Sequence, residues 1–315
     1  MHSLNTIFIC WVFVACSGVK YGDRTSESSQ NDADPDITNG EDSAGDTAAD
    51  DTGIDATDEV VCLGDYRPKT VEGLTELADC TRIEGSLRVA ETNLTTLDGL
   101  ENLQEIGFDL IIERNPDLVN FDGLANLERV GHDVDIREND SVIHLDALNQ
   151  LEHIGRHVDI SNNKFMTHLS GFSNLSDLTG DLQIWNNYAL LEVRGFTSIT
   201  TLNYDLDFRW NPELLSLEGL TNATSVGGIL YLESNAVLTD LSGLKGIQSI
   251  GAGLVIQYMD SLTDLSGMSS LESVEGEVTI SDNSTLCQST VEMWVETISI
   301  GLSETSTLCC NDTTC

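Results

Sequence analysis

The chain has 315 residues, of which 40% are apolar, and a formal net charge of −39 from 53 acidic and 14 basic side chains. The apolar content is enough for one sizeable core with flanking tails. The charge argues against a nucleic-acid partner, because phosphates need a basic surface, and against electrostatic docking onto anionic lipid. An acidic surface suits a secreted protein or one that holds cations or basic partners.

Residues 1–16 predict a signal peptide. The apolar run from Ile7 to Ala15 is too short to span a bilayer and has the length of a signal-peptide core. Its end, Phe13-Val14-Ala15-Cys16, resembles a bacterial lipobox, which implies that Cys16 is acylated and becomes the mature N-terminus. The region before the run has no Lys or Arg, and Phe13 stands where Leu is usual. A plain secretory signal is the alternative.

Residues 17–61 predict a disordered acidic linker. The segment is rich in Asp, Ser, Thr, Gly and Ala, and its acids face only Lys20 and Arg24. Low hydrophobicity and like charge cannot offset the entropy of ordering a chain, so we interpret the segment as a self-repelling spacer.

The remaining cysteines lie on either side of a long segment, residues 81–286, that has none. This placement predicts disulfide-stapled ends in an oxidising compartment. Zinc is the competing interpretation, but the chain has no CxxC pair and no His beside either group. A Cys62–Cys80 bridge would close an N-terminal cap, whereas the four later cysteines allow three pairings. The expected disulfide residues are Cys62, Cys80, Cys287, Cys309, Cys310 and Cys315.

The cap between Cys62 and Cys80 has apolar residues at Val71, Leu74 and Leu77, a spacing that predicts a short helix. Beyond it the chain repeats a unit whose clearest copy is FDLIIERNPDLVNFDGLANLERVG, residues 108–131. A fixed period of this length is typical of a solenoid, in which one coil alone cannot bury its apolar face. The clearest marker is a column of Asn at intervals of 24 or a multiple of it, which only Met259 interrupts: Asn115, Asn139, Asn163, Asn187, Asn211, Asn235 and Asn283.

Each unit begins with a short alternating run that predicts one strand per coil and therefore a parallel sheet. In the reference unit Leu110 and Ile112 face inward and Ile111 faces outward. The apolar residues after the Asn recur every third residue, which does not fit an α-helix and indicates a tight return path. A Gly column on this path, interrupted at Ala147, implies a positive φ or a crowded backbone, and Ala147 favours crowding.

The entry Cys80-Thr81-Arg82-Ile83-Glu84-Gly85-Ser86-Leu87-Arg88-Val89 and the units after it resemble the receptor L domain family. Period, Asn, Gly and apolar columns agree over about residues 62–298. The resemblance implies a right-handed parallel β-helix related to leucine-rich repeats, closest to bacterial members carried on lipoproteins. Receptor signalling is not implied, because the chain has no kinase or cysteine-rich module.

Residues 287–298 predict a helical C-terminal cap. Ser289 with Glu292 has the spacing of a capping box, and an apolar face that includes Trp294 is expected to plug the last coil. The cysteine-rich tail, residues 299–315, is expected to be tied back by disulfides.

The outward strand face carries the non-repetitive information. Aromatic residues on adjacent coils offer stacking area for sugars or peptides, with Arg and Asp beside them for polar orientation. The alternative is that these rings cover one another, or that residues 210 and 258 turn inward. The candidate ligand-binding residues are Trp185, Arg209, Trp210, Tyr231, Tyr258 and Asp207, with Tyr188 nearby.

The same face carries stacked carboxylates that would repel one another unless a cation or a base intervenes. Weak Ca²⁺ binding there is one interpretation, and solvated charge is the other. A metal held by His144, His168 and Glu192 is a further alternative to exposed imidazoles. The stacked carboxylates are Asp109, Asp133, Asp135, Asp159, Asp181, Asp205 and Asp207.

These patterns predict an all-β solenoid with coils of about 24 residues and short helical, disulfide-stapled caps. We expect a non-catalytic protein of the cell envelope, lipid-anchored to the outer membrane or cell surface, that binds an extracellular protein or polysaccharide through its sheet face. No cofactor is expected. Secretion is the alternative location. A structural envelope spacer and a polysaccharide-degrading β-helix enzyme are the alternative functions, although the uninterrupted repeat leaves no inserted loops to wall a cleft.

Overall fold

The computed structural model describes residues 59–300, 306–309 and 311–313. The signal peptide with Cys16, nearly all of the linker, Cys310 and Cys315 lie outside the described residues. Strand β1 (Val61–Cys62) already includes a residue that the sequence assigned to the linker. In the described ranges, no helix is both long and apolar enough to cross a membrane.

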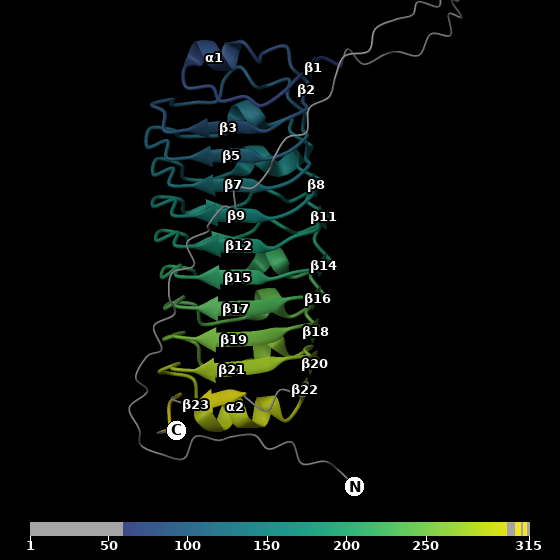
Figure 1. Cartoon of the computed structure of the whole chain (residues 1–315). Coiled ribbons are helices and arrows are strands. Elements are labelled where there is room, and N and C mark those ends of the chain that lie inside the picture. The colour runs from purple at the N-terminus through teal and green to yellow at the C-terminus, as the bar shows by residue number, and fades with distance from the viewer. Residues whose placement is uncertain (1–58, 301–305, 310, 314–315) are drawn as a thin grey trace, which may run out of the picture. The chain divides into compact units, whose positions relative to one another are not determined.

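Within the described ranges, ten parallel strands form one sheet, with each unit of the repeat contributing one strand (Figure 1). Successive strands pair at equivalent positions, so that Leu110 lies beside Val134 and Ile112 beside Ile136. The strands are β3 (Leu87–Ala90), β5 (Leu110–Glu113), β7 (Val134–Arg137), β9 (Val158–Ser161), β12 (Leu182–Trp185), β15 (Leu206–Arg209), β17 (Ile229–Glu233), β19 (Gly253–Gln257), β21 (Glu277–Ser281) and β23 (Thr307–Cys309).

Shorter parallel strands follow the return path. One sheet contains β1, β2 (Arg82–Ile83), β4 (Glu105–Ile106), β6 (Arg129–Val130), β8 (His153–Ile154) and β11 (Asp177–Leu178). A second contains β14 (Thr201–Leu202), β16 (Ser225–Val226), β18 (Ser249–Ile250), β20 (Ser273–Val274) and β22 (Ser299–Ile300). A separate two-stranded parallel sheet contains β10 (His168–Leu169) and β13 (Glu192–Val193).

The return path is tight, as the spacing of its apolar residues predicted, and in several coils it contains a short 3₁₀-helix. Each is too short for a full amphipathic helix, and each packs its apolar residues into the interior. They are η1 (Asp122–Leu124), η2 (Asp146–Gln150), η3 (Glu218–Leu220), η4 (Ser242–Leu244) and η5 (Ser266–Met268). The arrangement is a parallel β-rich stack of coils, consistent with a β-solenoid.

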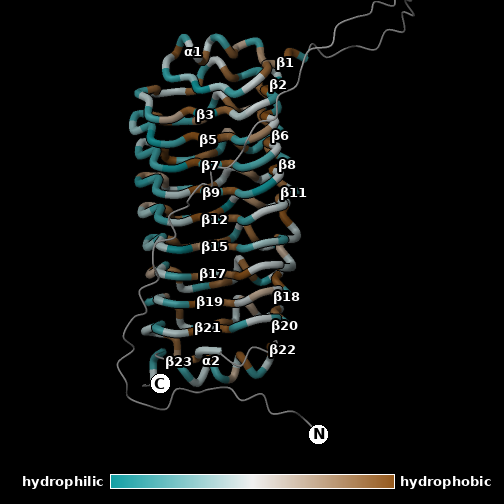
Figure 2. Tube along the Cα trace, in the orientation of Figure 1, coloured by the Kyte–Doolittle hydropathy of each residue, from teal (hydrophilic) through white to brown (hydrophobic). Residues whose placement is uncertain are grey.

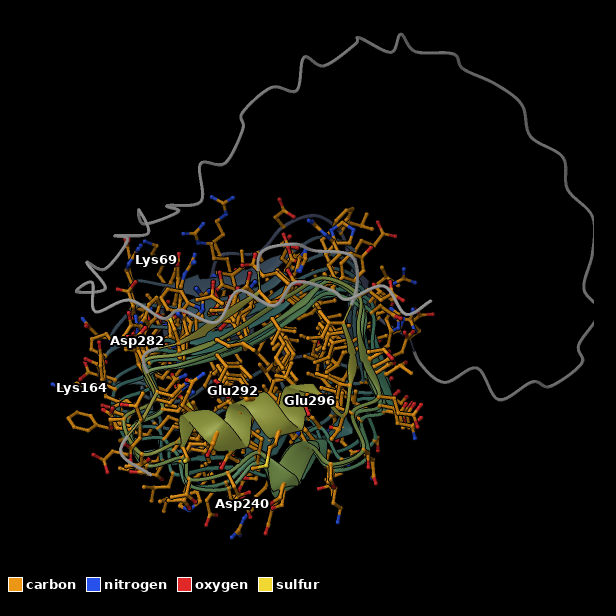
Figure 3. All side chains as sticks on the ribbon, turned by 90° about the horizontal axis from the view of Figure 1, so that it is seen from below. Lys69, Lys164, Asp240, Asp282, Glu292 and Glu296 are labelled. Atoms are coloured by element: carbon orange, nitrogen blue, oxygen red, sulfur yellow. A yellow bond between two sulfur atoms is a disulfide. The ribbon has the colours of Figure 1, made fainter. Side chains whose placement is uncertain are left out.

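The core lies between the ten-stranded sheet and the return path. Leu110 and Ile112 are fully buried, and so are their equivalents along the sheet. Along the tube of Figure 2, apolar residues alternate within the strands and hydrophilic residues gather at the turns. Figure 3, seen along the stack, shows side chains filling the interior while Lys164 and Asp240 lie at the periphery.

The Asn column forms a ladder of buried amides from coil to coil. The backbone N–H of Asn163 donates to Oδ1 of Asn187 over 3.1 Å, and Nδ2 of Asn187 donates to the carbonyl oxygen of Ile160 over 2.8 Å. Each amide thus satisfies a backbone donor and a backbone acceptor that the turn leaves without a strand partner. All seven Asn side chains are fully buried.

The ladder also continues into the C-terminal tail, where the sequence did not predict a further coil. Oδ1 of Asn311 accepts from the backbone N–H of Asn283 over 3.3 Å, and its Nδ2 donates to the carbonyl of Ile280 over 3.1 Å. Asn311 therefore continues the column after a spacing of 28 residues, lengthened by the helix between them. At Met259 the ladder lacks an amide: Nδ2 of Asn235 lies 3.9 Å from the sulfur, while the N–H of Met259 still donates to Oδ1 of Asn283 over 2.9 Å.

The Gly column is explained mainly by crowding, as Ala147 indicated. A Cβ added to Gly219 would lie 1.9 Å from the carbonyl oxygen of Gly195. Only at Gly99 does this column take a positive φ, of 106°. Neighbouring coils therefore approach most closely where the return path turns, and a side chain there would push them apart.

Helix α1 (Val71–Thr75) closes the first coil and is capped by Thr70, whose Oγ1 accepts from the N–H of Gly73 over 3.2 Å. Leu74 and Leu77 are buried as predicted, whereas Val71 points to solvent. The Cys62–Cys80 disulfide is present, with its Cα atoms 5.8 Å apart.

Helix α2 (Gln288–Val295) closes the other end, and Trp294 packs against the core as expected. The predicted capping box is wrong, because the helix begins two residues earlier than a Ser289 cap requires and its N-cap is Cys287. The N–H of Gln288 instead donates to the backbone carbonyl of Asp312 over 2.8 Å, so the tail replaces the Ser289 side chain. Cys287 is also disulfide-bonded, and the pairing within the tail lies outside the described residues.

We predict that Asn187→Ala lowers the free energy of unfolding by about 2–6 kcal/mol. The change leaves the N–H of Asn163 and the carbonyl of Ile160 without their side-chain partners, and each unsatisfied buried group costs about 1–3 kcal/mol. Urea denaturation measures the effect. Asn203→Ala, the same change at an exposed side chain, is the control and should alter stability by less than about 0.5 kcal/mol. Equal stabilities for the two variants would contradict the role of the ladder.

Candidate ligand-binding surface

The structure brings five of the six predicted site residues together on the outward side of the ten-stranded sheet. Trp185 ends β12 and lies beside Arg209, which ends β15. Asp207 of β15 lies beside Tyr231 of β17. Trp210 directly follows Arg209 at the turn after β15. We call these residues the aromatic cluster: Trp185, Asp207, Arg209, Trp210 and Tyr231.

Arg209 is the centre of the aromatic cluster. Its Nε lies 2.8 Å from each carboxylate oxygen of Asp207. The guanidinium carbon lies 5.2 Å from the ring centre of Trp210 and 5.1 Å from that of Tyr231, so both rings make cation–π contacts. The ring of Trp185 meets that of Trp210 edge to face at 6.2 Å. Arg209 therefore fixes the positions of the rings instead of offering a free charge.

The carboxylate that holds Arg209 is almost completely buried, because Asp207 is only 2% exposed. Burial raises the pKa of Asp207, and the charges of Asp205 and Asp181 add to this effect. The hydrogen bonds and charge of Arg209 act in the opposite direction. Removal of Arg209 would leave a buried carboxylate without compensation, so Arg209 and Asp207 form one structural unit.

Trp185 is held by a second carboxylate. Its indole Nε1 donates to Oδ1 of Asp159 over 3.1 Å, which ties β12 to the neighbouring β9. Trp185 is half-buried. One edge of the ring is thus fixed by the sheet, and the part that stays exposed adjoins Trp210.

Trp210 occupies a backbone position that recurs in every coil, immediately before the Asn column. These residues share a positive φ, and we call them the corner column. Its members are Glu91, Arg114, Glu138, Asn162, Asn186, Trp210, Ser234, Tyr258 and Asp282.

Both aromatic members of the corner column point outward, so the alternative of inward rings is wrong. Trp210 is 38% exposed and Tyr258 is 44% exposed. The residue that follows each ring is fully buried, Asn211 after Trp210 and Met259 after Tyr258, and the ring before it stays on the surface. Tyr258 lies two coils beyond Trp210, with Ser234 between them, and is therefore separate from the aromatic cluster. Tyr188 is exposed on the turn after Asn187.

The outermost acidic column consists of the residues that directly precede strands of the ten-stranded sheet. Its side chains have a structural role that was not predicted from the sequence. Each side chain accepts the backbone N–H of its equivalent in the next coil, for example Asp181 from Asp205 over 2.9 Å. His157 replaces a carboxylate in this series, and its Nδ1 accepts from the N–H of Asp181 over 2.9 Å. The acceptors in this series are Asp109, Asp133, His157, Asp181 and Asp205.

The predicted metal alternatives acquire no ligand set from this geometry. In the part of the chain that the structure describes, no group of three or more His, Cys, Asp and Glu side chains is arranged to hold a metal ion. His168 approaches Glu192 at 3.8 Å, whereas His144 approaches Asp146 at 3.5 Å. Weak Ca²⁺ binding at the carboxylates stays a prediction.

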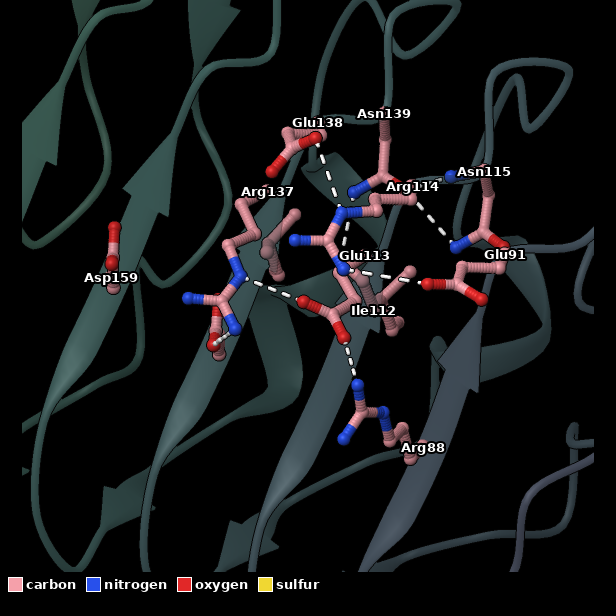
Figure 4. A network of polar contacts seen from close by, with 12 residues as sticks. Arg88, Glu91, Ile112, Glu113, Arg114, Asn115, Arg137, Glu138, Asn139 and Asp159 are labelled. Carbon is pink, nitrogen blue, oxygen red and sulfur yellow. Dashed lines mark hydrogen bonds and ion pairs between the residues drawn. The ribbon is translucent and has the colours of Figure 1, made fainter. Parts of the chain in front are cut away.

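A second polar network on the same face was not predicted from the sequence. The alternation that turns Ile111 outward turns Glu113 outward too, yet Glu113 is only 1% exposed because arginines from both neighbouring strands cover it. It pairs with Arg88 and accepts from Nε of Arg137 over 2.8 Å (Figure 4). Above them, Arg114 of the corner column approaches Glu91 at 3.4 Å and Glu138 at 3.3 Å.

The arginines determine the charge state of Glu113. Burial is the largest influence and raises the pKa of Glu113, but the hydrogen bond and charge of Arg137 and the charges of Arg88 and Arg114 bring it below its ordinary value. Arg88, Glu113 and Arg137 follow one another at intervals of about one coil, and this alternation of charge was the signal of the network in the sequence. It could be read as a buried network only after strand register was known.

Between the Glu113 network and the aromatic cluster, two carboxylates lie side by side on β7 and β9. Asp135 and Asp159 are register partners. Burial raises the pKa of Asp135 to about 7, and although Arg137 lies 3.0 Å away and opposes this, Asp159, Glu113 and Asp133 add to the rise. Burial also raises the pKa of Asp159. The centre of the face therefore favours protons or hydrogen-bond donors.

Comparison of the chain with protein-family models, with curated proteins and with solved structures gave no match. The functional argument therefore rests on the geometry of the sheet face. The aromatic cluster and the two aromatic residues of the corner column are where the side chains of that face depart most from the repeat.

The parent protein should lose folding stability as pH rises, and we predict that Asp135→Asn reduces this loss. Because the pKa is raised in the folded state, folded protein binds more protons than unfolded protein between about pH 4 and pH 7, and stability falls as pH rises through this window. The variant should gain up to about 4 kcal/mol over the parent at pH 8, since each pKa unit corresponds to about 1.4 kcal/mol. Urea denaturation at pH 4, 6 and 8 measures the difference.

Asp264→Asn is the control with the opposite sign. Hydrogen bonds from the side chain and backbone of Ser266 lower the pKa of Asp264, so its contribution to stability is present at neutral pH and is lost as pH falls. The Asp264 variant should therefore be less stable than the parent at pH 8. If Asp135→Asn shifts stability equally at pH 4 and pH 8, the pKa of Asp135 is not raised in the fold.

Proposed function

We propose that this protein is a non-catalytic binding or adhesion protein that recognises an extracellular protein or polysaccharide through the outward face of its ten-stranded sheet. The observation that carries the proposal is the aromatic cluster. Its Arg209 fixes two rings by cation–π contacts, and its exposed Trp210 lies edge to face with Trp185.

Rigidity is what makes the aromatic cluster suitable for binding. Tryptophan and tyrosine supply large contact areas with few rotatable bonds, and rings that are already fixed lose little entropy when a ligand binds. The cluster lies on regular strands, and those strands are positioned by the Asn ladder. Contiguous exposed aromatic surface on a soluble protein commonly marks an interaction site.

The carboxylates support binding over catalysis. Asp207 is held by Arg209, Asp159 accepts from the indole of Trp185, and the outermost acidic column accepts backbone N–H groups. A catalytic carboxylate needs a pocket that orients substrate and excludes water, and the uninterrupted 24-residue spacing provides no inserted loops to wall one.

We further infer the relationship that the sequence suggested: a right-handed parallel β-helix related to the receptor L domain family. Buried Asn and apolar columns, short parallel strands and disulfide-closed ends support it. Right-handed crossovers between parallel strands are nearly universal, which favours that hand. We place the protein at the cell envelope, anchored by lipid on Cys16, with secretion as the alternative.

We predict that the double substitution Trp185→Ala with Trp210→Ala lowers affinity for the ligand at least about 10-fold. Each ring contributes contact area and stacking energy, and truncated aromatic anchors at interfaces typically cost more than 1 kcal/mol each. Glycan-array binding and pull-down from cell-envelope extract measure the loss. Tyr204→Ala is the matched control, because Tyr204 is 54% exposed and precedes the start of β15, whereas Trp210 follows its end.

A double variant that folds and binds as the parent does would reject the aromatic cluster as the binding site. A parent protein that captures nothing from either source would favour the structural spacer. Far-ultraviolet circular dichroism of both variants separates loss of binding from loss of fold.

We predict that mass spectrometry of the mature protein finds an N-terminal acylated Cys16. Two or more acyl chains would anchor it firmly, since each buried CH₂ contributes about 0.8 kcal/mol. Cys16→Ser should therefore move the protein from the membrane fraction to the medium or the soluble fraction. An unmodified Cys16, or cleavage at another residue, would contradict the anchor and leave the plain secretory signal.

A further inference from the structure

We propose that the corner column binds an extended, neutral, β-1,4-linked glycan, with sugar rings stacked on Trp210 and Tyr258. The inference rests on the proposed binding function and names its ligand class. It also adds Tyr258 to the site as a second platform, apart from the aromatic cluster.

The backbone at these two residues is the first observation. Trp210 and Tyr258 each have φ of 54°, in the left-handed region that bulky side chains rarely adopt. Asn and Asp tolerate this conformation best, and Asn162, Asn186 and Asp282 occupy it in other coils. Polar residues occupy the remaining positions of the column, so Trp210 and Tyr258 are its only bulky aromatic members within the described residues. Such outliers concentrate at functional sites.

The rings at these positions are not explained by packing of the core. Phe172 and Phe196 also have positive φ, but both are buried and stack on each other at 5.3 Å, so their rings serve the interior. Trp210 and Tyr258 remain 38% and 44% exposed. The strained aromatics of the corner column thus point to solvent, where a ligand can reach them.

The spacing of the two rings favours a polymer. Trp210 and Tyr258 are separated by two coils, or about 10 Å along the stack, since neighbouring parallel strands lie about 4.8 Å apart. Two residues of an extended β-1,4-linked glycan span a similar length, and alternate rings of such a chain present the same face. One chain running along the stack can therefore place every second ring on an aromatic residue.

Polar groups between the two platforms suit sugar hydroxyls. Ser234 occupies the intermediate corner, and half-buried Glu233 and Gln257 end strands β17 and β19 beside it. These side chains offer both donors and acceptors, which is the requirement for orienting hydroxyl groups. Glu233 lies on the side of Tyr258 that faces Trp210.

Charge selects against anionic polymers. From Trp210 to the end of the chain, the sequence has one basic residue, Lys245, among many acids. The nearest other cation, Arg209, is already held by Asp207 and covered by two rings. A uronate or sulfated chain would therefore meet uncompensated negative charge, whereas a neutral chain loses no favourable contact.

The test measures binding of cellohexaose and cellobiose to the full-length protein by titration calorimetry and tryptophan fluorescence. We expect cellohexaose to bind more tightly than cellobiose, because only the longer chain reaches both platforms. Tyr258→Asn should weaken cellohexaose binding about 3- to 10-fold and remove its advantage over cellobiose. Trp210→Asn should weaken the binding of both cellohexaose and cellobiose.

Asn is chosen because it suits the left-handed backbone, and circular dichroism checks that the Tyr258→Asn variant is folded. Tyr204→Asn removes an equally exposed ring elsewhere and should leave binding unchanged. Oligogalacturonate hexamer serves as the anionic comparator and should bind at least 10-fold more weakly than cellohexaose.

Oligogalacturonate binding as tight as cellohexaose binding would overturn the neutral ligand class. Full cellohexaose affinity in a folded Tyr258→Asn variant would overturn the second platform. A parent that ignores cellohexaose but captures an envelope component through Trp185 and Trp210 would overturn this inference and leave the proposed function standing. The proposed function itself fails separately, if the Trp185 and Trp210 double variant retains all binding.

Discussion

The buried Asn amide is the interaction on which the rest of this structure depends. At each turn after the ten-stranded sheet, a backbone N–H and a carbonyl lose their strand partners inside the protein, and the amide of the next coil satisfies both. A missing amide leaves two buried polar groups, so the column tolerates little change. The residue before the Asn must then turn outward with a positive φ, which creates the corner column.

Because the ladder fixes one register for all coils, it also fixes what lies beside what on the outward face. Glu113 is buried only because Arg88 and Arg137 come from the adjacent strands. Asp181 can accept the N–H of Asp205 only because the two occupy equivalent positions. The charged residues of this face therefore hold adjacent coils together. Many of the acidic residues that suggested cation binding serve this structural role.

Periodicity was enough to predict the inward columns, the buried Asn and the crowded Gly path, because those features depend only on position within a coil. It was not enough for features that depend on neighbouring coils or on an altered spacing. Asn311 escaped notice because α2 lengthens its interval to 28 residues. The outward turn of Trp210 and Tyr258 follows from backbone conformation, which the column of unlike residues at that corner does not reveal.

The two aromatic corners are informative because they oppose the logic of the rest of the chain. Elsewhere in the repeat a residue suits its place: Gly where coils crowd, Asn where the backbone lacks partners, and polar side chains at the other positions of the corner column. Trp210 and Tyr258 combine a positive φ with an exposed aromatic ring. Burial explains neither ring, and at Trp210 the contact with Arg209 orders the ring without covering it. An exposed ring at a backbone position that disfavours bulky side chains is therefore the feature on which the proposed glycan contact rests.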